Sequence, residues 1–393
     1  MSNDAVIVDV VRTPTGRGKS GGALSGIHPA DLLAGVLRQL VSRNDLDPAL
    51  VDDVIGGCVS QTGEQSFNII RTALLSAGFP ESVPGTTVDR QCGSSQQAAT
   101  FAAQAVMAGS ADIVIACGVE SMSRVPLGSS SAGQRRGGDL FAQRYPEGLV
   151  SQGVSAELIT QKWGFSRDDL DEFAARSHRL AAEAGASGAF AREMVAVTTP
   201  DGPITVDETV RPGTTVDALA GLKSAFRTDE LAARFPDLTW QTTAGNSSPL
   251  TDGASAALIM SAEKASSLGL TPRARFHSFA VTGSDPLFML TGVIPATLRI
   301  LDRAGLSIDD MDVYEVNEAF ACVPLAWQRD VGAHVDKLNP RGGAIALGHA
   351  LGSSGTRLLA TLVNNLESSG GRFGLQVMCE GGGMANATII ERL

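Results

Sequence analysis

The sequence has little lysine, histidine, cysteine or aromatic character, and it has a deficit of positive charge. Its 393 residues include 5 Lys, 5 His and 5 Cys, aromatic residues make up 5%, and the net charge at pH 7 is −11. An acidic chain repels polyanions, so we expect neither nucleic acid nor an anionic membrane surface as a partner. An anionic substrate must then be bound by a local group of positive side chains.

The chain also lacks segments that direct or anchor a protein. No apolar run approaches the length of a membrane span, and the opening MSNDAVIVDV has neither the basic start nor the apolar run of a secretory signal. The cysteines have no CxxC pair and no metal-ligand spacing, and their odd number indicates free thiols. We therefore expect a cytoplasmic protein without a metal site; its cysteines are Cys58, Cys92, Cys117, Cys322 and Cys379.

What is present is the alternation typical of an α/β protein. Short runs rich in Val and Ile, at 5–12, 111–121 and 374–383, alternate with longer Ala-rich segments of helical period. Buried parallel strands with covering helices explain this pattern best. The length exceeds what one core usually holds, so two or three packed units are expected.

Two stretches show the same order of features, which indicates a duplicated βαβ unit. One runs from Thr86 through a turn with Gly and Ser and an Ala-rich helix into the strand of Cys117. The other runs from Leu338 through a Gly-rich turn and a helix into the strand of Cys379. The polar, Gly-rich segment between them follows neither copy. We predict an N-terminal half at 1–120 that continues at 251–272, an inserted loop domain at 121–250 and a C-terminal half at 273–393.

Cys92 stands between a predicted strand and an apolar-periodic helix, so its thiol is expected at a helix N-terminus. The partial positive charge there favours the thiolate, and a shift of ~2 pKa units corresponds to roughly 2.7 kcal/mol. Gly93 removes a side chain where a substrate would approach. A small buried residue at a strand–helix junction is the alternative interpretation, and the motif by itself leaves both open.

His349 lies in GGAIALGHALGSSG, where glycines free the backbone and leave the imidazole open to a ligand. The ring can take a proton from a thiol near neutral pH, or it can merely satisfy hydrogen bonds of the loop. Cys379 ends a strand and runs into Glu380 and three glycines, whose N–H groups are the donors that an oxyanion needs. Asn317, in EVNEAFA, can hold a water through its amide or serve as a turn residue.

Together, and in chain order, VDRQCGSSQQA, VNEAFA, GGAIALGHALGSSG and CEGGG resemble the motifs of the thiolase family over essentially the whole length. The segments GGCVSQTGEQSFNIIRTALLSAG and TAGNSSPLTDGA are also similar to that family. The resemblance implies an α/β fold with a five-layered α-β-α-β-α core, built from two duplicated halves, and an inserted loop domain. It also implies a homodimer or homotetramer whose substrates are acyl-CoA thioesters, with no permanently bound cofactor.

By position in the matching motifs, the resemblance assigns Cys92 as the acylated nucleophile and His349 as its base. Cys379 becomes the acid/base for the α-proton of the second acyl-CoA. Asn317 would hold a water that, with His349, receives the thioester oxygen, and the N–H groups of Cys92 and Gly381 would form the oxyanion hole of the acyl group. Such residues suit ping-pong acyl transfer, either thiolysis of a 3-ketoacyl-CoA or the reverse Claisen condensation.

For the CoA substrate, the resemblance places the pantetheine along the AGNSS segment at Ser248 and the nucleotide near Lys223, against the loop domain. A solvated surface charge is the alternative for Lys223. Ser151, Gln152 and Phe320 complete the expected contacts with the substrate.

The sequence departs from the family pattern at three places. Ala350 replaces the proline usual after the catalytic histidine, and Glu380 stands where a small or aliphatic residue is common. If strand alternation holds, the Glu380 carboxylate points away from the site; otherwise it raises the pKa of Cys379. Ser151-Gln152 replaces a His-Met pair that lines the acyl pocket, so acyl groups beyond acetoacetyl are expected. These departures favour the degradative 3-ketoacyl-CoA branch, including its steroid-catabolic members.

Three other functions fit parts of the pattern. A ketoacyl-synthase-type condensing enzyme of the same superfamily pairs its cysteine with two histidines, where this chain has the NEAF asparagine and a terminal cysteine. A non-catalytic CoA- or lipid-binding relative would not need all the reactive positions. A thiol redox protein would need a resolving cysteine, and neither Cys92 nor Cys379 has one nearby in sequence. Acyl transfer is the function we expect.

Overall fold

The computed structural model describes residues 4–135 and 137–393; residues 1–3 of the opening segment and residue 136 of the Gly-rich loop lie outside the described residues. The strands form one mixed sheet in the order β10-β11-β12-β9-β1-β8-β5-β3-β4, with β2 beside β8 and a separate β6-β7 hairpin. The strands are β1 Ala5–Arg12, β2 Gly16–Arg17, β3 Asp53–Gly57, β4 Gly85–Val88, β5 Ile113–Ser121, β6 Val197–Thr199, β7 Gly202–Ile204, β8 Thr251–Ser261, β9 Ala274–Gly283, β10 Val313–Val316, β11 Phe373–Glu380 and β12 Met384–Arg392.

The sheet consists of two halves that meet along a short seam. In the N-terminal half β3 runs parallel to β4 and β5, and in the C-terminal half β10 runs parallel to β11. Among the described residues, the sheets of the two halves pair where β1 meets β9, through Val6–Arg275 and Ile7–Ala274. Each half therefore presents its own two faces to covering helices.

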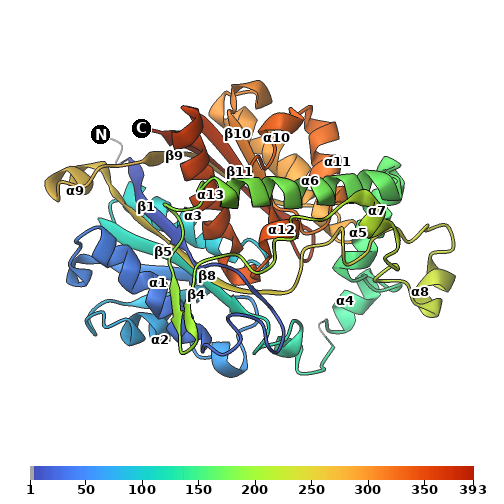
Figure 1. Ribbon diagram of the computed structural model, residues 1–393, viewed down its shortest axis with the longest axis horizontal. Coiled ribbons are helices and arrows are strands. Elements are labelled where there is room, and N and C mark those ends of the chain that lie inside the picture. Colours follow the sequence, from blue (N-terminus) through green and yellow to red (C-terminus); the bar gives the residue numbers. More distant parts are fainter. Residues whose placement is uncertain (1–3, 136) are drawn as a thin grey trace.

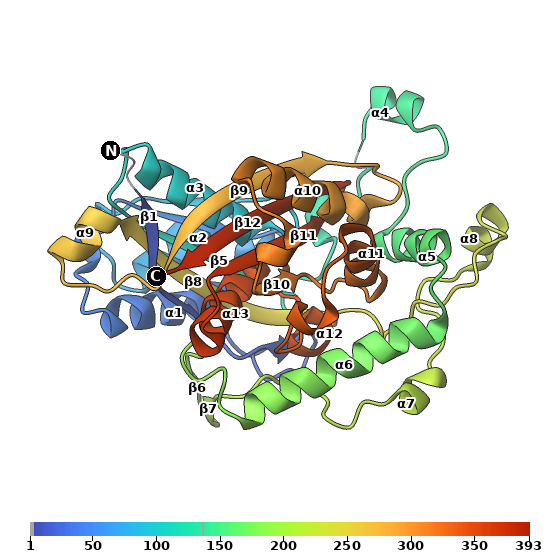
Figure 2. The same ribbon diagram turned by 90° about the horizontal axis from the view of Figure 1, so that it is seen from above.

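Helices cover both faces of each half and give the molecule five layers (Figures 1 and 2). The central helices α3 and α13 pack between the halves, α1 and α2 cover the outer face of the N-terminal half, and α10 and α11 cover that of the C-terminal half. This order confirms the predicted α-β-α-β-α core. The helices of the core are α1 Pro29–Arg43, α2 Ile69–Ser76, α3 Ser94–Met107, α9 Ala262–Ser267, α10 Val293–Ala304, α11 Cys322–Val331, α12 Ala344–Leu347 and α13 Ser354–Ser369.

The duplication is visible in the central layer. α3 is followed by β5 and α13 by β11, and every residue of both strands is buried. A strand covered on both faces needs a continuous apolar run rather than an alternating one, which is the pattern of both segments. The predicted pair of βαβ-type halves is confirmed.

Glycines bring the backbones of the two halves into contact. A Cβ atom at Gly57 would lie 2.6 Å from the carbonyl oxygen of Gly352, and one at Gly352 would lie 2.5 Å from that of Val119. A Cβ atom at Gly355 would collide with the backbone of Gln96 in α3. Since these separations are below any van der Waals contact, only glycine permits this approach.

Between β5 and β8 the chain leaves the sheet and forms a lobe whose helices α4, α5, α7 and α8 gather at one end of the molecule (Figure 1), while its β6-β7 hairpin packs against the N-terminal half. Its longest element is α6, the polar helix expected after Ser166, and Ser166 and Asp169 cap each other across its first turn. Long connections separate its elements, as the composition indicated. They are α4 Asp139–Arg144, α5 Gln152–Trp163, α6 Arg167–Ala186, the β6-β7 hairpin, α7 Val216–Ala220 and α8 Asp229–Arg234.

A buried arginine fastens this lobe to the sheet. The Arg12 guanidinium, at the end of β1, lies 2.7 Å from Glu193 and 2.7 Å from Asp207. All three side chains are buried, so each charge is compensated by its partners. Among the described helices, none combines the length and the hydropathy that crossing a bilayer requires.

We expect Gly352→Ala to lower the free energy of unfolding by roughly 1–3 kcal/mol or more, because the added methyl group meets backbone atoms that cannot move aside. Urea unfolding followed by circular dichroism measures the change. Gly35→Ala is the matched control, since a Cβ at Gly35 in α1 meets nothing within 4 Å. That change should stabilise the helix by roughly 0.5–1 kcal/mol. Equal effects of both substitutions would contradict the packing role of Gly352.

Candidate active site

Cys92 lies at the start of the central helix α3, as predicted. The chain leaves β4, Gln91 takes a left-handed φ of 50°, and Gly93 is the N-cap residue. A left-handed φ is costly for a residue with a Cβ, so the turn is held by its surroundings. The turn aims the Cys92 side chain between the two halves, where it is buried.

The environment of Cys92 does not favour its thiolate, which corrects the expectation from the helix terminus. Burial raises the pKa of Cys92 well above its ordinary value, and the nearby Cys379 and Glu380 raise it further. A hydrogen bond from the Gln152 side chain opposes the shift but does not outweigh it. Since the resting group is a thiol, it needs a base.

His349 supplies an uncharged imidazole with a defined tautomer. Its Nδ1 lies 2.7 Å from the Ser354 hydroxyl, which donates its own hydrogen to the carbonyl oxygen of Ala350 at 2.9 Å. Ser354 can therefore only accept from His349, which places the ring proton on Nδ1 and leaves Nε2 as a base. Burial, together with repulsion by the Arg357 guanidinium, lowers the pKa of His349 to about 3.

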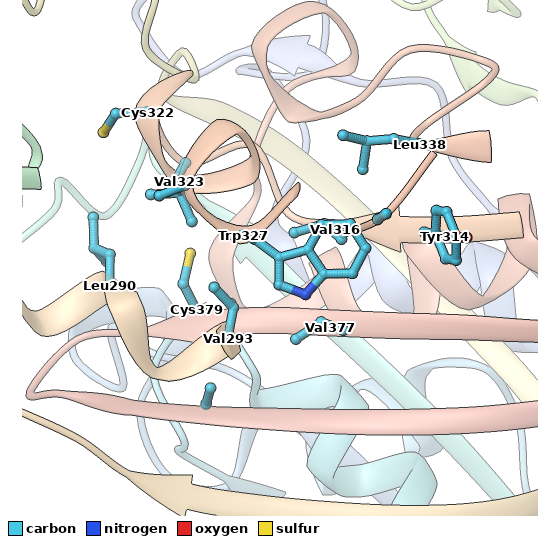
Figure 3. Close-up of a cluster of buried hydrophobic side chains, with 14 of the residues drawn as sticks. Leu290, Val293, Tyr314, Val316, Cys322, Val323, Trp327, Leu338, Val377 and Cys379 are labelled. Atoms are coloured by element: carbon cyan, nitrogen blue, oxygen red, sulfur yellow. The ribbon is translucent and has the colours of Figure 1, made fainter. Parts of the chain in front are cut away.

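Asn317 and Cys379 complete the group of reactive side chains. The Asn317 Nδ2 lies 3.5 Å from His349 Nε2 and 3.7 Å from the Cys379 sulfur. Its Oδ1 is buried and has no hydrogen-bond partner in the described part of the chain, so this oxygen is free for a water or a substrate. Burial raises the pKa of Cys379 to about 11. Figure 3 shows its sulfur pointing from β11 towards the helix that carries Val323.

A glycine turn follows Cys379 and faces the Cys92 side of the site. Gly382 and Gly383 have left-handed φ angles of 88° and 80°, which turn the chain sharply after β11. A Cβ atom at Gly381 would lie 3.0 Å from the Gln91 Oε1 and 3.2 Å from the Gln152 Nε2. The Gly381 backbone thus adjoins the turn that carries Cys92.

A cavity of about 350 Å³ opens onto Cys92 and His349, whereas Cys379, Asn317 and Gly381 are not among the residues that line it. It is lined by six of the residues predicted from the sequence, namely Cys92, Ser151, Gln152, Ser248, Phe320 and His349. Lys223 is exposed and does not line it. The lining residues that sequence reasoning missed include Gln91, Met122, Leu127, Phe226, Ser247, Leu250 and Leu351.

Gln91 and Phe226 differ in whether the sequence contained information that places them at the site. Gln91 adjoins the cysteine motif, so its place beside Cys92 could have been inferred. Phe226 lies in the lobe, close in sequence to Lys223 but with no signal of its own, and packs edge-on against Phe320 with ring centroids 5.7 Å apart. Only tertiary contact brings this pair together. Ser248 holds the cavity wall near them, with its N–H and its hydroxyl both donating to the carbonyl oxygen of Ala319.

The structure changes the interpretation of Gly93 and Glu380. Strand alternation holds, and the Glu380 carboxyl leaves β11 on the face opposite Cys379. That face packs against the start of α3, so the carboxyl does not point away from the site but lies beside Cys92. A Cβ atom at Gly93 would collide with it, so Gly93 makes room for Glu380 rather than for a substrate.

Ala350 keeps the backbone that a proline would impose. Its φ is −71° and its ψ is 99°. Proline fixes φ near −65°, so the turn after His349 has the same course without it. The departure from the family pattern therefore leaves the local geometry unchanged.

A buried thiol at a helix start and a neutral imidazole on one cavity, with a second thiol close to the imidazole in a duplicated five-layered core, are the features of an acyltransferase. The family models for the thiolase N-terminal domain and the thiolase C-terminal domain match residues 5–263 and 270–392. The chain belongs to the thiolase family.

Three relatives illustrate this membership. The chain is 48% identical to the steroid 3-ketoacyl-CoA thiolase FadA6 of Mycobacterium tuberculosis, over 99% of this chain and 94% of that one. It is 45% identical to a 3-ketoacyl-CoA thiolase of Saccharophagus degradans, over 99% and 98%. The crystal structure of the Bacillus anthracis acetyl-CoA acetyltransferase matches with a TM-score of 0.88 and 36% identity, over 100% of this chain and 99% of that one.

We expect Ser354→Ala to slow acylation of Cys92 by at least about tenfold, because the ring proton can then occupy Nε2, the atom that must act as base. Single-turnover acylation by acetyl-CoA, followed by intact-mass spectrometry, measures the rate. Ser353→Ala is the matched control, since the Ser353 hydroxyl only makes a 3.4 Å contact with the carbonyl oxygen of Ala350. A similar loss in both variants would show that Ser354 does not act through the imidazole.

Proposed function

We propose that this protein catalyses thiolysis of 3-ketoacyl-CoA substrates, and the reverse Claisen condensation, by ping-pong transfer through an acyl group on Cys92. The observation that carries the proposal is that Cys92 and His349 line one cavity, while the Asn317 amide bridges His349 to the second thiol, Cys379, and has an unpartnered oxygen. Acyl transfer needs a nucleophile that is also a good leaving group, and carbon–carbon bond cleavage needs a separate proton donor.

In the first half-reaction His349 Nε2 takes the Cys92 proton, and the sulfur attacks the keto carbon of the substrate. The bond between C2 and C3 breaks and leaves its electron pair on C2, which takes a proton from Cys379, so acetyl-CoA departs. Because the pKa of Cys379 is about 11, this thiol is protonated at neutral pH and ready to donate.

In the second half-reaction the thiol of free CoA gives its proton to the Cys379 thiolate and attacks the acyl group on Cys92. The shortened acyl-CoA leaves, and Cys92 recovers its proton from the His349 imidazolium. The low pKa of His349, about 3, makes that imidazolium a strong acid towards the departing sulfur.

Each half-reaction develops a negatively charged oxygen that needs donors. The backbone N–H groups of Cys92 and Gly381 serve the oxygen of the acyl group, a role supported by the turn that sets Gly381 beside Gln91. His349 and a water held by Asn317 serve the thioester oxygen of the other substrate. The free Oδ1 of Asn317 supports this second role.

The acyl-CoA enters through the cavity, with its pantetheine along Ser248 and Phe320. The nucleotide lies outside against the lobe, where exposed Lys223 offers a positive charge. The acyl tail passes Ser151 and Gln152, which line the cavity at the start of α5. The names of the steroid and 3-ketoacyl-CoA thiolase relatives support an acyl group larger than acetoacetyl and a role in fatty acid or steroid degradation.

The protein acts in the cytoplasm as a homodimer or homotetramer. The absence of disulfides among its cysteines is compatible with that compartment. β4 is the last strand of the sheet, and its outer edge has no partner strand among the described residues. The Phe67 side chain near this edge is 95% exposed, and an unpaired edge beside an apolar side chain supports association between copies.

Incubation of the wild type with acetyl-CoA is expected to add one acetyl group at Cys92, located by peptide mass spectrometry. Cys92→Ser should lose the label. Cys379→Ala should retain acetyl exchange between CoA and Cys92 but lose thiolysis and condensation by at least about a hundredfold, the usual contribution of a positioned acid/base. Label found only on Cys379, or equal loss of both activities in a folded Cys379→Ala protein, would overturn these roles.

Replacing Ser151-Gln152 by His-Met should move the preferred substrate towards acetoacetyl-CoA. A methylene in an apolar pocket is worth only ~1–3 kcal/mol, so the shift in kcat/KM should be graded along a series of 3-ketoacyl-CoA chain lengths. Lys223→Ala is the control: it should raise KM for all chain lengths alike, because it contacts the common nucleotide. A wild type that prefers acetoacetyl-CoA by more than about tenfold would contradict the proposal on acyl size.

A further inference from the structure

A buried carboxyl group without a partner lies beneath the proposed nucleophile. The Glu380 side chain is fully buried, and neither of its oxygens has a hydrogen-bond partner in the described part of the chain. It fills the space that Gly93 leaves at the N-cap of α3, one residue after Cys92. A buried polar atom without a partner is costly, so this position needs an explanation beyond packing.

The charged and titratable groups around the Glu380 carboxyl come from the turn before α3 and from β11. The turn before α3 contributes Arg90, which favours the ionised form of Glu380, and Asp89, which opposes it. The ionised carboxyl lies beside Cys92 and on the opposite face of β11 from Cys379, and it raises the pKa of both thiols.

β12 adds a polar but uncharged neighbour. Asn386 donates through its Nδ2 to the carbonyl oxygen of Gly93 at 3.2 Å, and its Oδ1 is buried without a partner. Within 4 Å, the described residues offer Glu380 no ion pair. The carboxyl is thus held close to both thiols without a direct ion pair, and Arg90 is the nearby cation that favours its ionised form.

Burial is the largest influence on this group and raises the pKa of Glu380 to about 8. At neutral pH the group is therefore mostly the uncharged acid. Above about pH 8 it becomes a carboxylate, and like charges in a buried site oppose each other. A carboxylate beside Cys92 disfavours the thiolate, so ionisation of Glu380 should slow every reaction of that sulfur.

We propose that Glu380 is a positioning residue that acts through Cys92: as the uncharged acid it permits ionisation of the nucleophile, and as the carboxylate it suppresses the nucleophile at alkaline pH. The proposal rests on Cys92 being the nucleophile of the proposed function, and it adds a residue that touches no substrate. Gly93 is required for this arrangement, because any larger residue at that position would displace the Glu380 carboxyl.

The test is the rate at which iodoacetamide alkylates Cys92, measured by peptide mass spectrometry between about pH 6 and 9.5. Glu380→Gln keeps the shape of the side chain and removes its charge. Its alkylation rate should match the wild type at pH 7 and exceed it by up to about tenfold at pH 9, the effect of one pKa unit on the thiolate population. Glu380→Ala, a second uncharged variant, should show the same difference, and thermal unfolding reports whether each variant is folded.

Glu315→Gln is the matched control. Glu315 is also buried, burial also raises its pKa to about 8, and one of its oxygens lacks a partner, but it faces Arg357 instead of the cysteines. This variant should keep the pH dependence of the wild type. The proposal is overturned if Glu380→Gln and the wild type have parallel pH profiles, or if Glu315→Gln alone removes the alkaline suppression.

Alkylation needs no acyl-CoA, so the two proposals can fail separately. Suppose that the pH dependence of alkylation changes in Glu380→Gln but acetyl-CoA does not acylate the wild type. The role of Glu380 would then stand, and the proposed thiolase reaction would be overturned. If acetyl-CoA acylates the wild type but the pH dependence of alkylation is the same in Glu380→Gln, the thiolase reaction would stand and the role of Glu380 would be overturned.

Discussion

The Glu120 carboxylate, at the end of β5, holds the two halves of the molecule in register. It accepts hydrogen bonds from the N–H groups of Val59 and Ser60 at 2.9 and 3.1 Å and from that of Gly352 at 2.9 Å. The first two follow β3 of the N-terminal half, and Gly352 belongs to the turn before α13. Because the glycines here allow backbone contact, this one carboxylate sets the His349 turn against the start of α3, and the site depends on that placement.

Burial then decides the protonation state of Cys92 and His349, the two side chains that the Glu120 contact helps to bring together. Removing a thiol from water disfavours its anion, and removing an imidazole disfavours its cation. Cys92 is consequently a thiol and His349 an uncharged imidazole, so in the proposed reaction the proton transfer between them accompanies the attack on substrate instead of preceding it. The hydroxyl of Ser354 adds direction, since it fixes which ring nitrogen is free.

The three departures from the thiolase sequence pattern differ in how much they change the structure and electrostatics of the site. Ala350 leaves the turn after His349 unchanged, because its φ of −71° is the one that proline imposes. Glu380 alters the electrostatics of the site, because its carboxyl lies beneath Cys92 at a position where a small or aliphatic side chain is the expected one. Gln152 places an amide against the Cys92 sulfur, where the family has an apolar side chain. The residue bounds predicted for the two halves and the loop domain stay a prediction, and so do the roles of the site residues.

The sequence by itself determined the layered α/β class, the helix start at Cys92 and the Gly-rich turns at His349 and after Cys379. These features are local, because periodicity, caps and turns depend on residues a few positions apart. Only the tertiary structure decided that Glu380 fills the space of Gly93, that Phe226 closes the cavity and that Lys223 stays outside it. Burial and contact between distant segments are collective properties of the packed chain, and they set the pKa values on which the chemistry depends.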